Sequence, residues 1–262
     1  MSTHELLGTV VGDIVDDILL ENQSTRSMYD ALRDGHRKGV RVIAELKPSS
    51  PSKGELRSIN ARDLPSIVEE LESGGAHAIS VLVEPRRFGG CLENLKIARE
   101  CTDLPLLAKG FLFSPRQLAE CMTAGADAYL LMVRVVDAVQ QDAGRLIELG
   151  EGLGMEAFIE ANTPDEIIKA QAVGATILEV NNRDIYADLS LDLDNAALGK
   201  DLPTDIAFVS ASGIAAAADV ERVYTASNGR VDAILVGSSL MTNSSISRKV
   251  AELVASGEGV VR

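Results

Sequence analysis

Short apolar runs recur along the chain from residue 41 onward, each followed by a loop and then by an amphipathic segment. Eight such runs start about 27 residues apart on average, which is the length of one βα unit. We expect strands at 42–47, 78–83, 104–109, 128–133, 156–160, 176–181, 206–210 and 233–236. Because these runs are apolar along their whole length and alternate with helices, they predict a parallel sheet covered by helices.

Glycine marks four of the predicted helix-to-strand joints, at Gly74, Gly125, Gly174 and Gly229. A helix often ends in a left-handed residue, which is usually glycine, so these positions support the division into repeated units. Eight βα units close most naturally into an α/β fold of the (β/α)8 TIM-barrel type. The alternative is an open doubly wound sheet. Its first strand usually leads into a GxGxxG turn, whereas segment 48–51 reads Pro-Ser-Ser-Pro.

The first 40 residues predict an N-terminal helical extension ahead of the barrel. Apolar residues recur at helical spacing between residues 6 and 19, and Ser24 is a candidate cap for a second helix through Met28 to Gly39. We therefore expect a single domain over residues 1–262, in which this extension precedes a barrel formed by residues 41–262.

Composition narrows the range of partners. The chain has 39 acidic and 25 basic residues and a formal net charge of −14, which argues against binding to nucleic acid or to an anionic membrane. The basic residues are 8 lysines and 17 arginines, and an acidic chain with so little lysine suggests adaptation to high salt. Three cysteines without metal spacing, and an apolar N-terminal run broken by aspartates, predict a cytoplasmic protein without signal peptide or membrane span. We expect a monomer or a weak homodimer.

Charged and amide side chains gather where the predicted strands end. Glu45 and Lys47 are two residues apart, so on a strand their side chains point to the same face. Taken alone, this pair is equally well explained as a surface ion pair on an edge strand. The other strand ends carry Lys109, Glu160, Asn181 and Arg183. In a barrel all of these side chains meet at one mouth, which favours an active site.

The residues at this mouth predict acid–base chemistry on an anionic substrate. Three of the eight lysines, Lys47, Lys53 and Lys109, would lie there and make the pocket positive. Burial and neighbouring positive charge would lower the pKa of Lys109, which could then protonate a carbonyl or hydroxyl group. Glu160 could remove or return a proton. Since no histidine or cysteine falls at a strand end, a Ser–His hydrolase or a zinc site is not expected.

Small residues end the seventh and eighth predicted strands, at Ser212-Gly213 and Gly237-Ser238. They let backbone N–H groups approach a ligand, which is the usual phosphate grip of this fold. Tight turns without a ligand are the alternative. Because both strands share the feature, the sequence predicts a sugar-phosphate substrate.

Eight short segments carry a further resemblance. They are 43–54 (IAELKPSSPSKG), 80–84 (SVLVE), 88–90 (FGG), 106–111 (LLAKGF), 158–160 (FIE), 180–184 (VNNRD), 212–214 (SGI) and 236–241 (VGSSLM). In this order they resemble the indole-3-glycerol phosphate synthase family of the tryptophan pathway. The resemblance covers nearly the whole chain, including the helical extension.

The resemblance implies a reaction and a set of roles. The substrate would be 1-(2-carboxyphenylamino)-1-deoxyribulose 5-phosphate, which undergoes ring closure, decarboxylation and dehydration without cofactor or metal. By position, Lys109 resembles the general acid and Glu160 the general base. Glu45 would hold and tune the lysines, Lys47 would assist dehydration, and Asn181 would orient the substrate. The implied substrate- and phosphate-binding positions are Ser50, Lys53, Phe88, Phe111, Leu131, Arg183, Ser212, Gly213, Gly237 and Ser238. Within this set Phe88, Phe111 and Leu131 would be the apolar walls for the anthranilate ring.

The chain departs from the family pattern at two positions near the mouth. Gly110 stands where the family usually has an aspartate after the lysine, and Ala211 stands where it often has a glutamate. Each departure removes a carboxylate, and Gly110 leaves open how Lys109 is held. Three rival functions remain: a phosphoribosylanthranilate isomerase-like barrel, a Schiff-base aldolase acting through Lys109, and a phosphate-binding barrel without catalytic activity.

Overall fold

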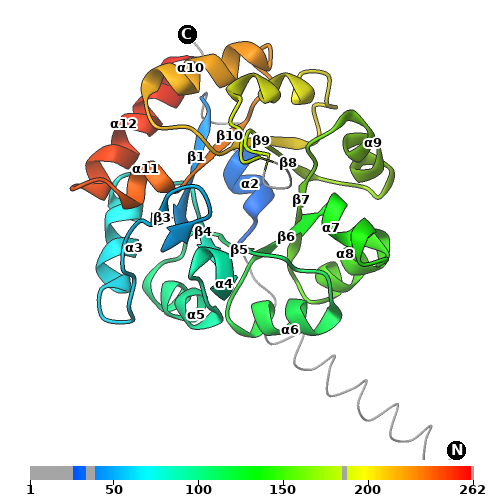
Figure 1. Ribbon diagram of the computed structural model, residues 1–262, viewed down its shortest axis with the longest axis horizontal. Helices are drawn as coiled ribbons and strands as arrows, with labels where there is room; N and C mark the ends of the chain where they lie inside the picture. Colours follow the sequence, from blue (N-terminus) through cyan, green and yellow to red (C-terminus); the bar gives the residue numbers. More distant parts are fainter. Residues whose placement is uncertain (1–25, 34–38, 185–187, 261–262) are drawn as a thin grey trace, which may run out of the picture.

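Eight parallel strands close into one barrel with helices around it (Figure 1). This computed structural model describes residues 26–33, 39–184 and 188–260. The order around the barrel is β1-β10-β9-β8-β7-β6-β5-β4, so consecutive barrel strands are neighbours and the last one pairs with the first. The strands are β1 (Arg41–Leu46), β4 (Ala78–Leu82), β5 (Leu106–Lys109), β6 (Ala128–Met132), β7 (Glu156–Glu160), β8 (Ile177–Asn181), β9 (Ala207–Ala211) and β10 (Ala233–Val236). The predicted TIM barrel and its eight strands are confirmed.

The main strand-boundary difference lies at β5, which begins at Leu106 and not at residue 104 as expected. Pro105 has no N–H to donate to the ladder, so regular pairing cannot start before it. Three of the four predicted left-handed joints are observed, at Gly125 (φ 91°), Gly174 (φ 81°) and Gly229 (φ 74°), whereas at the first joint Gly74 is still helical and the left-handed residue is Gly75 (φ 90°). Each lets the chain reverse from a helix into the next strand.

Helices follow the strands around the outside of the barrel. The longer ones are α3 (Leu64–Ser73), α5 (Leu92–Cys101), α6 (Pro115–Thr123), α8 (Ala143–Gly152), α9 (Pro164–Ala172), α10 (Ala217–Ala226) and α12 (Ile246–Gly259). The sixth unit carries a 3-10 helix instead, η1 (Leu193–Gly199). It packs closely on the sheet, since a Cβ at Gly199 would lie 2.2 Å from the ring of Phe208.

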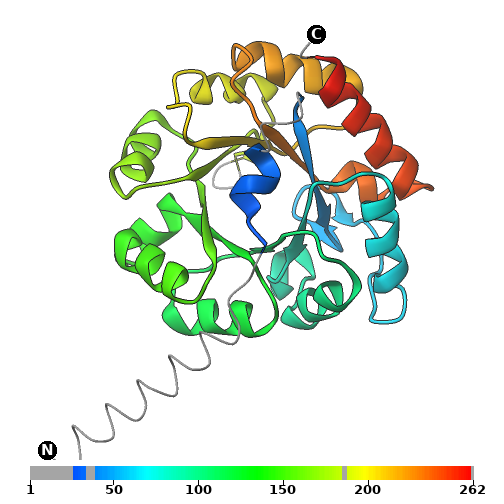
Figure 2. The same ribbon diagram turned by 180° about the vertical axis from the view of Figure 1, so that it is seen from behind.

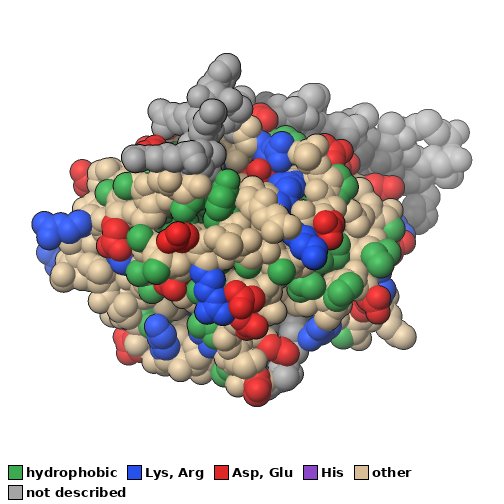
Figure 3. Space-filling model, turned by 90° about the horizontal axis from the view of Figure 1, so that it is seen from above, with side chains coloured by type: hydrophobic (Ala, Val, Ile, Leu, Met, Phe, Trp, Pro, Cys, Tyr) green, Lys and Arg blue, Asp and Glu red, His purple; other side chains and the backbone are tan. Residues whose placement is uncertain are grey.

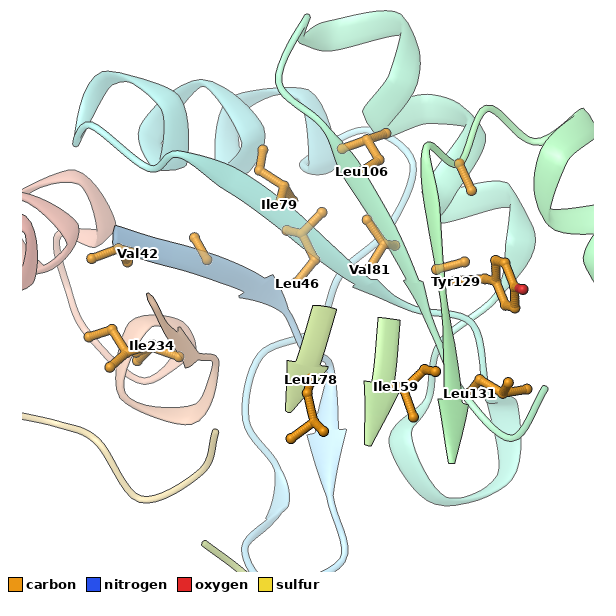
Figure 4. Packing of buried hydrophobic residues seen from close by; sticks show 14 of the residues in the cluster. Val42, Leu46, Ile79, Val81, Leu106, Tyr129, Leu131, Ile159, Leu178 and Ile234 are labelled. Carbon is orange, nitrogen blue, oxygen red and sulfur yellow. The ribbon is translucent and has the colours of Figure 1, made fainter. Parts of the chain in front are cut away.

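The strands bury side chains on both of their faces. Outward-facing residues such as Val42, Ile79 and Leu178 pack between the barrel and the helices (Figure 4). Inward-facing residues such as Ile43, Leu107 and Phe158 fill the barrel interior. Toward the carboxyl ends of the strands, this inner apolar packing gives way to buried polar side chains. The alternation therefore decides which residues can reach the mouth.

A short helix, α2 (Met28–Arg33), closes the opposite end of the barrel, where Figure 2 shows it in front of the strands. Met28 and Leu32 are buried within the inner apolar cluster. The hydroxyl of Ser27 accepts the backbone N–H of Asp30 at 3.0 Å, so Ser27 caps this helix. Ser24 and the helix predicted between residues 6 and 19 lie outside the described residues.

Acidic and basic side chains are interspersed over the side of the molecule drawn in Figure 3. Within the described ranges, no helix has the length and hydropathy needed to cross a membrane.

Asp127 ties the strands to the segment that precedes α2. Its fully buried carboxylate accepts the backbone N–H of Leu106 at 2.8 Å, Arg99 Nη1 at 2.9 Å and Arg26 Nε at 3.0 Å. We expect Asp127→Ala to lower the free energy of unfolding by about 3 kcal/mol, because it leaves buried donors and cations unpaired. Urea unfolding measures this loss. The control is Glu69→Ala on the exposed face of α3, and an equal effect of the two changes would contradict the prediction.

Candidate active site

A cavity opens at the carboxyl ends of the barrel strands, where the sequence placed the site. Among the residues proposed from sequence, those lining it are Glu45, Lys47, Ser50, Lys53, Phe88, Lys109, Phe111, Glu160, Asn181, Arg183, Ser212, Gly213, Gly237 and Ser238. The remaining proposed residue, Leu131, does not line it. Ser50 and Lys53 reach the cavity from a small hairpin after β1, formed by β2 (Ser49–Ser50) and β3 (Gly54–Glu55).

The prediction that Leu131 forms a wall of the cavity is wrong. Leu131 is buried between the barrel and the helices (Figure 4), while its neighbours Leu130 and Met132 line the cavity. Successive side chains on a strand point to opposite faces, so a position shifted by one residue faces the helices and not the interior. The two phenylalanine walls are present, with the ring centroids of Phe88 and Phe111 6.4 Å apart and the rings tilted by 47°.

Lys109 is held by a glutamate that sequence reasoning did not select. Its Nζ donates to both carboxylate oxygens of Glu179, each at 2.7 Å, and the side chain of Glu179 is fully buried. The sequence did contain a signal, which is the alternation of side-chain direction along a strand. Glu179 lies two residues before Asn181 in an apolar strand, so both side chains point into the barrel.

The expectation that the pKa of Lys109 is lowered is also wrong. Burial does act to lower it, but Glu179, Glu45 and Glu160 all act to raise it, and the net shift is upward. The groups closest to this ammonium are carboxylates, which favour its charged form and outweigh the effect of burial. Lys109 is therefore protonated at neutral pH.

Glu160 lies beside Glu179 on the neighbouring strand. The two residues are register partners between β7 and β8, so their carboxyl groups face the same part of the barrel interior and Glu179 acts on the pKa of Glu160. Asn162 Nδ2 donates to Glu160 Oε1 at 2.9 Å. Burial and the charge of Glu179 raise the pKa of Glu160 to about 7, while Lys109 and Asn162 oppose the shift. A carboxyl group that gains and loses a proton near neutral pH suits acid–base catalysis.

Glu45 pairs directly with Lys47 and acts on Lys109 through its charge, which helps to raise the pKa of that lysine. Lys47 Nζ donates to Glu45 Oε2 at 2.9 Å and lies 5.3 Å from the centre of the Phe88 ring. Gly237 lies directly against this carboxylate, because a Cβ there would be 2.3 Å from Glu45 Oε2. The absence of a side chain at Gly237 thus allows the Glu45–Lys47 ion pair and the end of β10 to lie in the same corner of the cavity.

A chain of hydrogen bonds fixes the end of β8. Asn162 Oδ1 accepts the backbone N–H of Asn181 at 2.9 Å, and Asn181 Oδ1 accepts the backbone N–H of Arg183 at 3.0 Å. The guanidinium of Arg183 donates to the carbonyl of Leu189 at 2.7 Å. Arg183 is thereby oriented along the edge of the cavity.

Small residues border the cavity at the ends of β9 and β10, as the sequence predicted. Ser212 and Gly213 both have left-handed backbones, with φ of 72° and 82°, which is rare for a serine and signals a specialised turn. Gly237 precedes the short helix α11 (Ser238–Met241). Ser239 Oγ donates to the carbonyl of Ile214 at 3.0 Å and joins the two turns.

The fold and the cavity together define a (β/α)8-barrel protein with a buried acid–base cluster at its mouth. The model of the indole-3-glycerol phosphate synthase family matches residues 10–253. The chain belongs to this family, and thereby to the carboxy-lyases of tryptophan biosynthesis.

Individual relatives agree with this placement. An indole-3-glycerol phosphate synthase of Kineococcus radiotolerans is 40% identical over 228 residues, which cover 86% of this chain and 80% of that protein. One from Mycolicibacterium vanbaalenii is 35% identical over 244 residues, which cover 93% and 87%. Among solved structures, 3-hexulose-6-phosphate synthase from Salmonella typhimurium has a TM-score of 0.64 at 14% identity, covering 84% of this chain and 100% of that one. At this identity the likeness shows the barrel fold alone.

The raised pKa of Glu160 can be tested directly. We expect the carboxyl signal of Glu160 to titrate near pH 7 in 13C NMR, because burial and Glu179 keep the proton bound where an ordinary glutamate has lost it. The signal should disappear in Glu160→Gln and persist in Glu69→Gln, which changes an exposed carboxyl group. Titration of every glutamate signal below pH 5 would contradict the prediction.

Proposed function

We propose that this chain converts 1-(2-carboxyphenylamino)-1-deoxyribulose 5-phosphate to indole-3-glycerol phosphate, carbon dioxide and water, with Lys109 as general acid and Glu160 as general base. The observation that carries the proposal is that the same cavity is lined by Lys109, which is protonated, and by Glu160, whose pKa is near neutral. Membership of the family supports the same reaction.

The first step is ring closure. The ring carbon that bears the carboxylate attacks the ketone carbon of the substrate, and Lys109 donates a proton to the ketone oxygen as the new bond forms. The carboxylate then leaves as carbon dioxide, and its bonding electrons restore the aromatic ring. An ammonium held in place by Glu179 is suited to this donation, since no solvent has to reorganise around it.

Dehydration completes the indole. Glu160 takes a proton from the CH2 carbon next to the nitrogen, and the hydroxyl group on the adjacent carbon leaves as water with a proton from Lys47. The carbon–carbon double bond forms as these two bonds break. Glu45 holds Lys47 for this role, because Glu45 Oε2 accepts a hydrogen bond from Lys47 Nζ at 2.9 Å.

Substrate binding follows from the lining of the cavity. The anthranilate ring would lie against Phe88 and Phe111, with Arg183 and Asn181 orienting its polar groups. The phosphate would be held by the small turns, with residues Ser212, Gly213, Gly237 and Ser238. Lys53 and Ser50 would approach the substrate from the β2–β3 hairpin.

The pairing of Lys109 also weighs against the aldolase alternative. A lysine must be neutral to attack a carbonyl and form a Schiff base, and such lysines have lowered pKa values. Contact with both oxygens of Glu179 instead favours the charged form.

Replacement of Lys109 tests the proposed function. We expect Lys109→Ala to lower kcat roughly 10²–10⁴-fold, because the ketone oxygen then lacks its proton donor. Turnover is followed by the fluorescence of the indole product, at low salt and in molar salt. The control is Lys96→Ala on the exposed face of α5, which should keep full activity. Unchanged turnover of Lys109→Ala would overturn its role, and no turnover of the parent at either salt concentration would overturn the proposed function.

A further inference from the structure

Glu179 touches both members of the proposed acid–base pair. It accepts two hydrogen bonds from Lys109, and it lies directly beside Glu160, its register partner on the neighbouring strand, whose pKa it acts to raise. It is fully buried and does not line the cavity, so it lies behind the groups that face the substrate.

A carboxylate at this depth is costly unless it has partners. Its inward-facing neighbours Ile177 and Val209 are apolar, and an apolar side chain would pack there without loss of hydration. Lys109, in turn, has no carboxylate beside it on its own loop, because the next residue is Gly110. Glu45 bonds to Lys47. In the described part of the chain, Glu179 is the carboxylate that hydrogen-bonds Lys109.

We infer that Glu179 is a positioning residue for the proposed reaction, one that holds the Lys109 ammonium and connects it to Glu160 through a shared proton. The inference rests on the proposed function, which assigns the acid role to Lys109 and the base role to Glu160.

The charges around the pair favour a single shared proton. Three carboxyl groups, those of Glu45, Glu160 and Glu179, meet two ammonium groups, those of Lys47 and Lys109. The inward-facing residues of β9 and β10 nearby are Val209, Ala211 and Leu235, which carry no charge. One proton between Glu160 and Glu179 makes the whole cluster neutral, which is the least costly state in a buried site.

This connection gives the proton taken up by the base a route to the acid. After Lys109 has protonated the ketone oxygen, its amine is neutral. The proton that Glu160 removes from the substrate carbon passes along the hydrogen bonds through Glu179 to Lys109 and restores the ammonium. Each turnover also takes one proton from solvent, because loss of carbon dioxide from a carboxylate consumes one.

The test compares Glu179→Gln and Glu179→Asp with the parent, by steady-state kinetics between pH 5.5 and 9. We expect Glu179→Gln to lower kcat roughly tenfold or more while KM stays within about threefold, because Glu179 does not line the cavity. The acidic limb of the kcat profile should move to lower pH, since a negative neighbour of Glu160 has been removed. Glu179→Asp, which keeps the carboxylate, should recover part of kcat.

Glu156→Gln is the matched control. Glu156 also lies on β7 but at the opposite end, where it accepts the backbone N–H of Tyr29 at 3.1 Å and the hydroxyl of Ser27 at 2.8 Å. This change should lower thermal stability without moving the acidic limb. The inference is overturned if Glu179→Gln keeps kcat within about twofold of the parent, or if kcat falls with no movement of the limb.

Failure of the inference can be told apart from failure of the proposed function. If the parent protein shows no turnover, the proposed function is overturned before any variant is compared. If Glu179→Gln does not fold, the parent protein still decides the matter. In 13C NMR the shared proton requires two glutamate carboxyl signals that change together as it is lost. Two independent titrations would overturn the inference.

Discussion

Two carboxyl groups on neighbouring strands, Glu160 and Glu179, lie side by side inside the barrel and cannot both carry a full negative charge there without a cation. Lys109 supplies that cation from β5 with two short hydrogen bonds. The three groups therefore form one electrostatic unit, and removal of Lys109 or of Glu179 leaves a buried charge without its hydrogen-bonded partner. The raised pKa of Glu160 and the persistent charge of Lys109 are two consequences of this single arrangement.

Packing in the rest of the barrel offsets the cost in stability of burying these charged groups. Outward-facing side chains pack against the helices and stabilise the closed sheet, while most inward-facing ones toward the end that α2 closes are apolar, with Glu156 as an exception that bonds to Ser27 and Tyr29. Polar groups are concentrated toward the opposite end, next to the cavity. Stability and chemistry thus occupy different ends of the same strands, which is the general division of labour in this fold.

Sequence reasoning identified most of the candidate site because the motifs fall at strand ends, and parallel strands bring those ends together. Its two errors have local causes. Leu131 was assigned to the cavity wall through the resemblance to the family, yet alternation along β6 turns it toward the helices. The pKa of Lys109 was judged from burial and from the lysines expected at the same mouth, while the carboxylate that bonds it, Glu179, lies 70 residues away in sequence and was not selected.

The sequence alone therefore determined the fold, the family pattern and the set of residues at the mouth, because spacing and order along the chain record βα units and strand ends. Only the tertiary structure decided which of those residues pair. Closing the barrel brings β5, β7 and β8 around one small interior, and the distances there, not the spacing in sequence, assign Lys109 to Glu179 and Lys47 to Glu45. Electrostatic interactions depend on the distance between charged groups and on their burial, and the order of residues along the chain gives neither quantity.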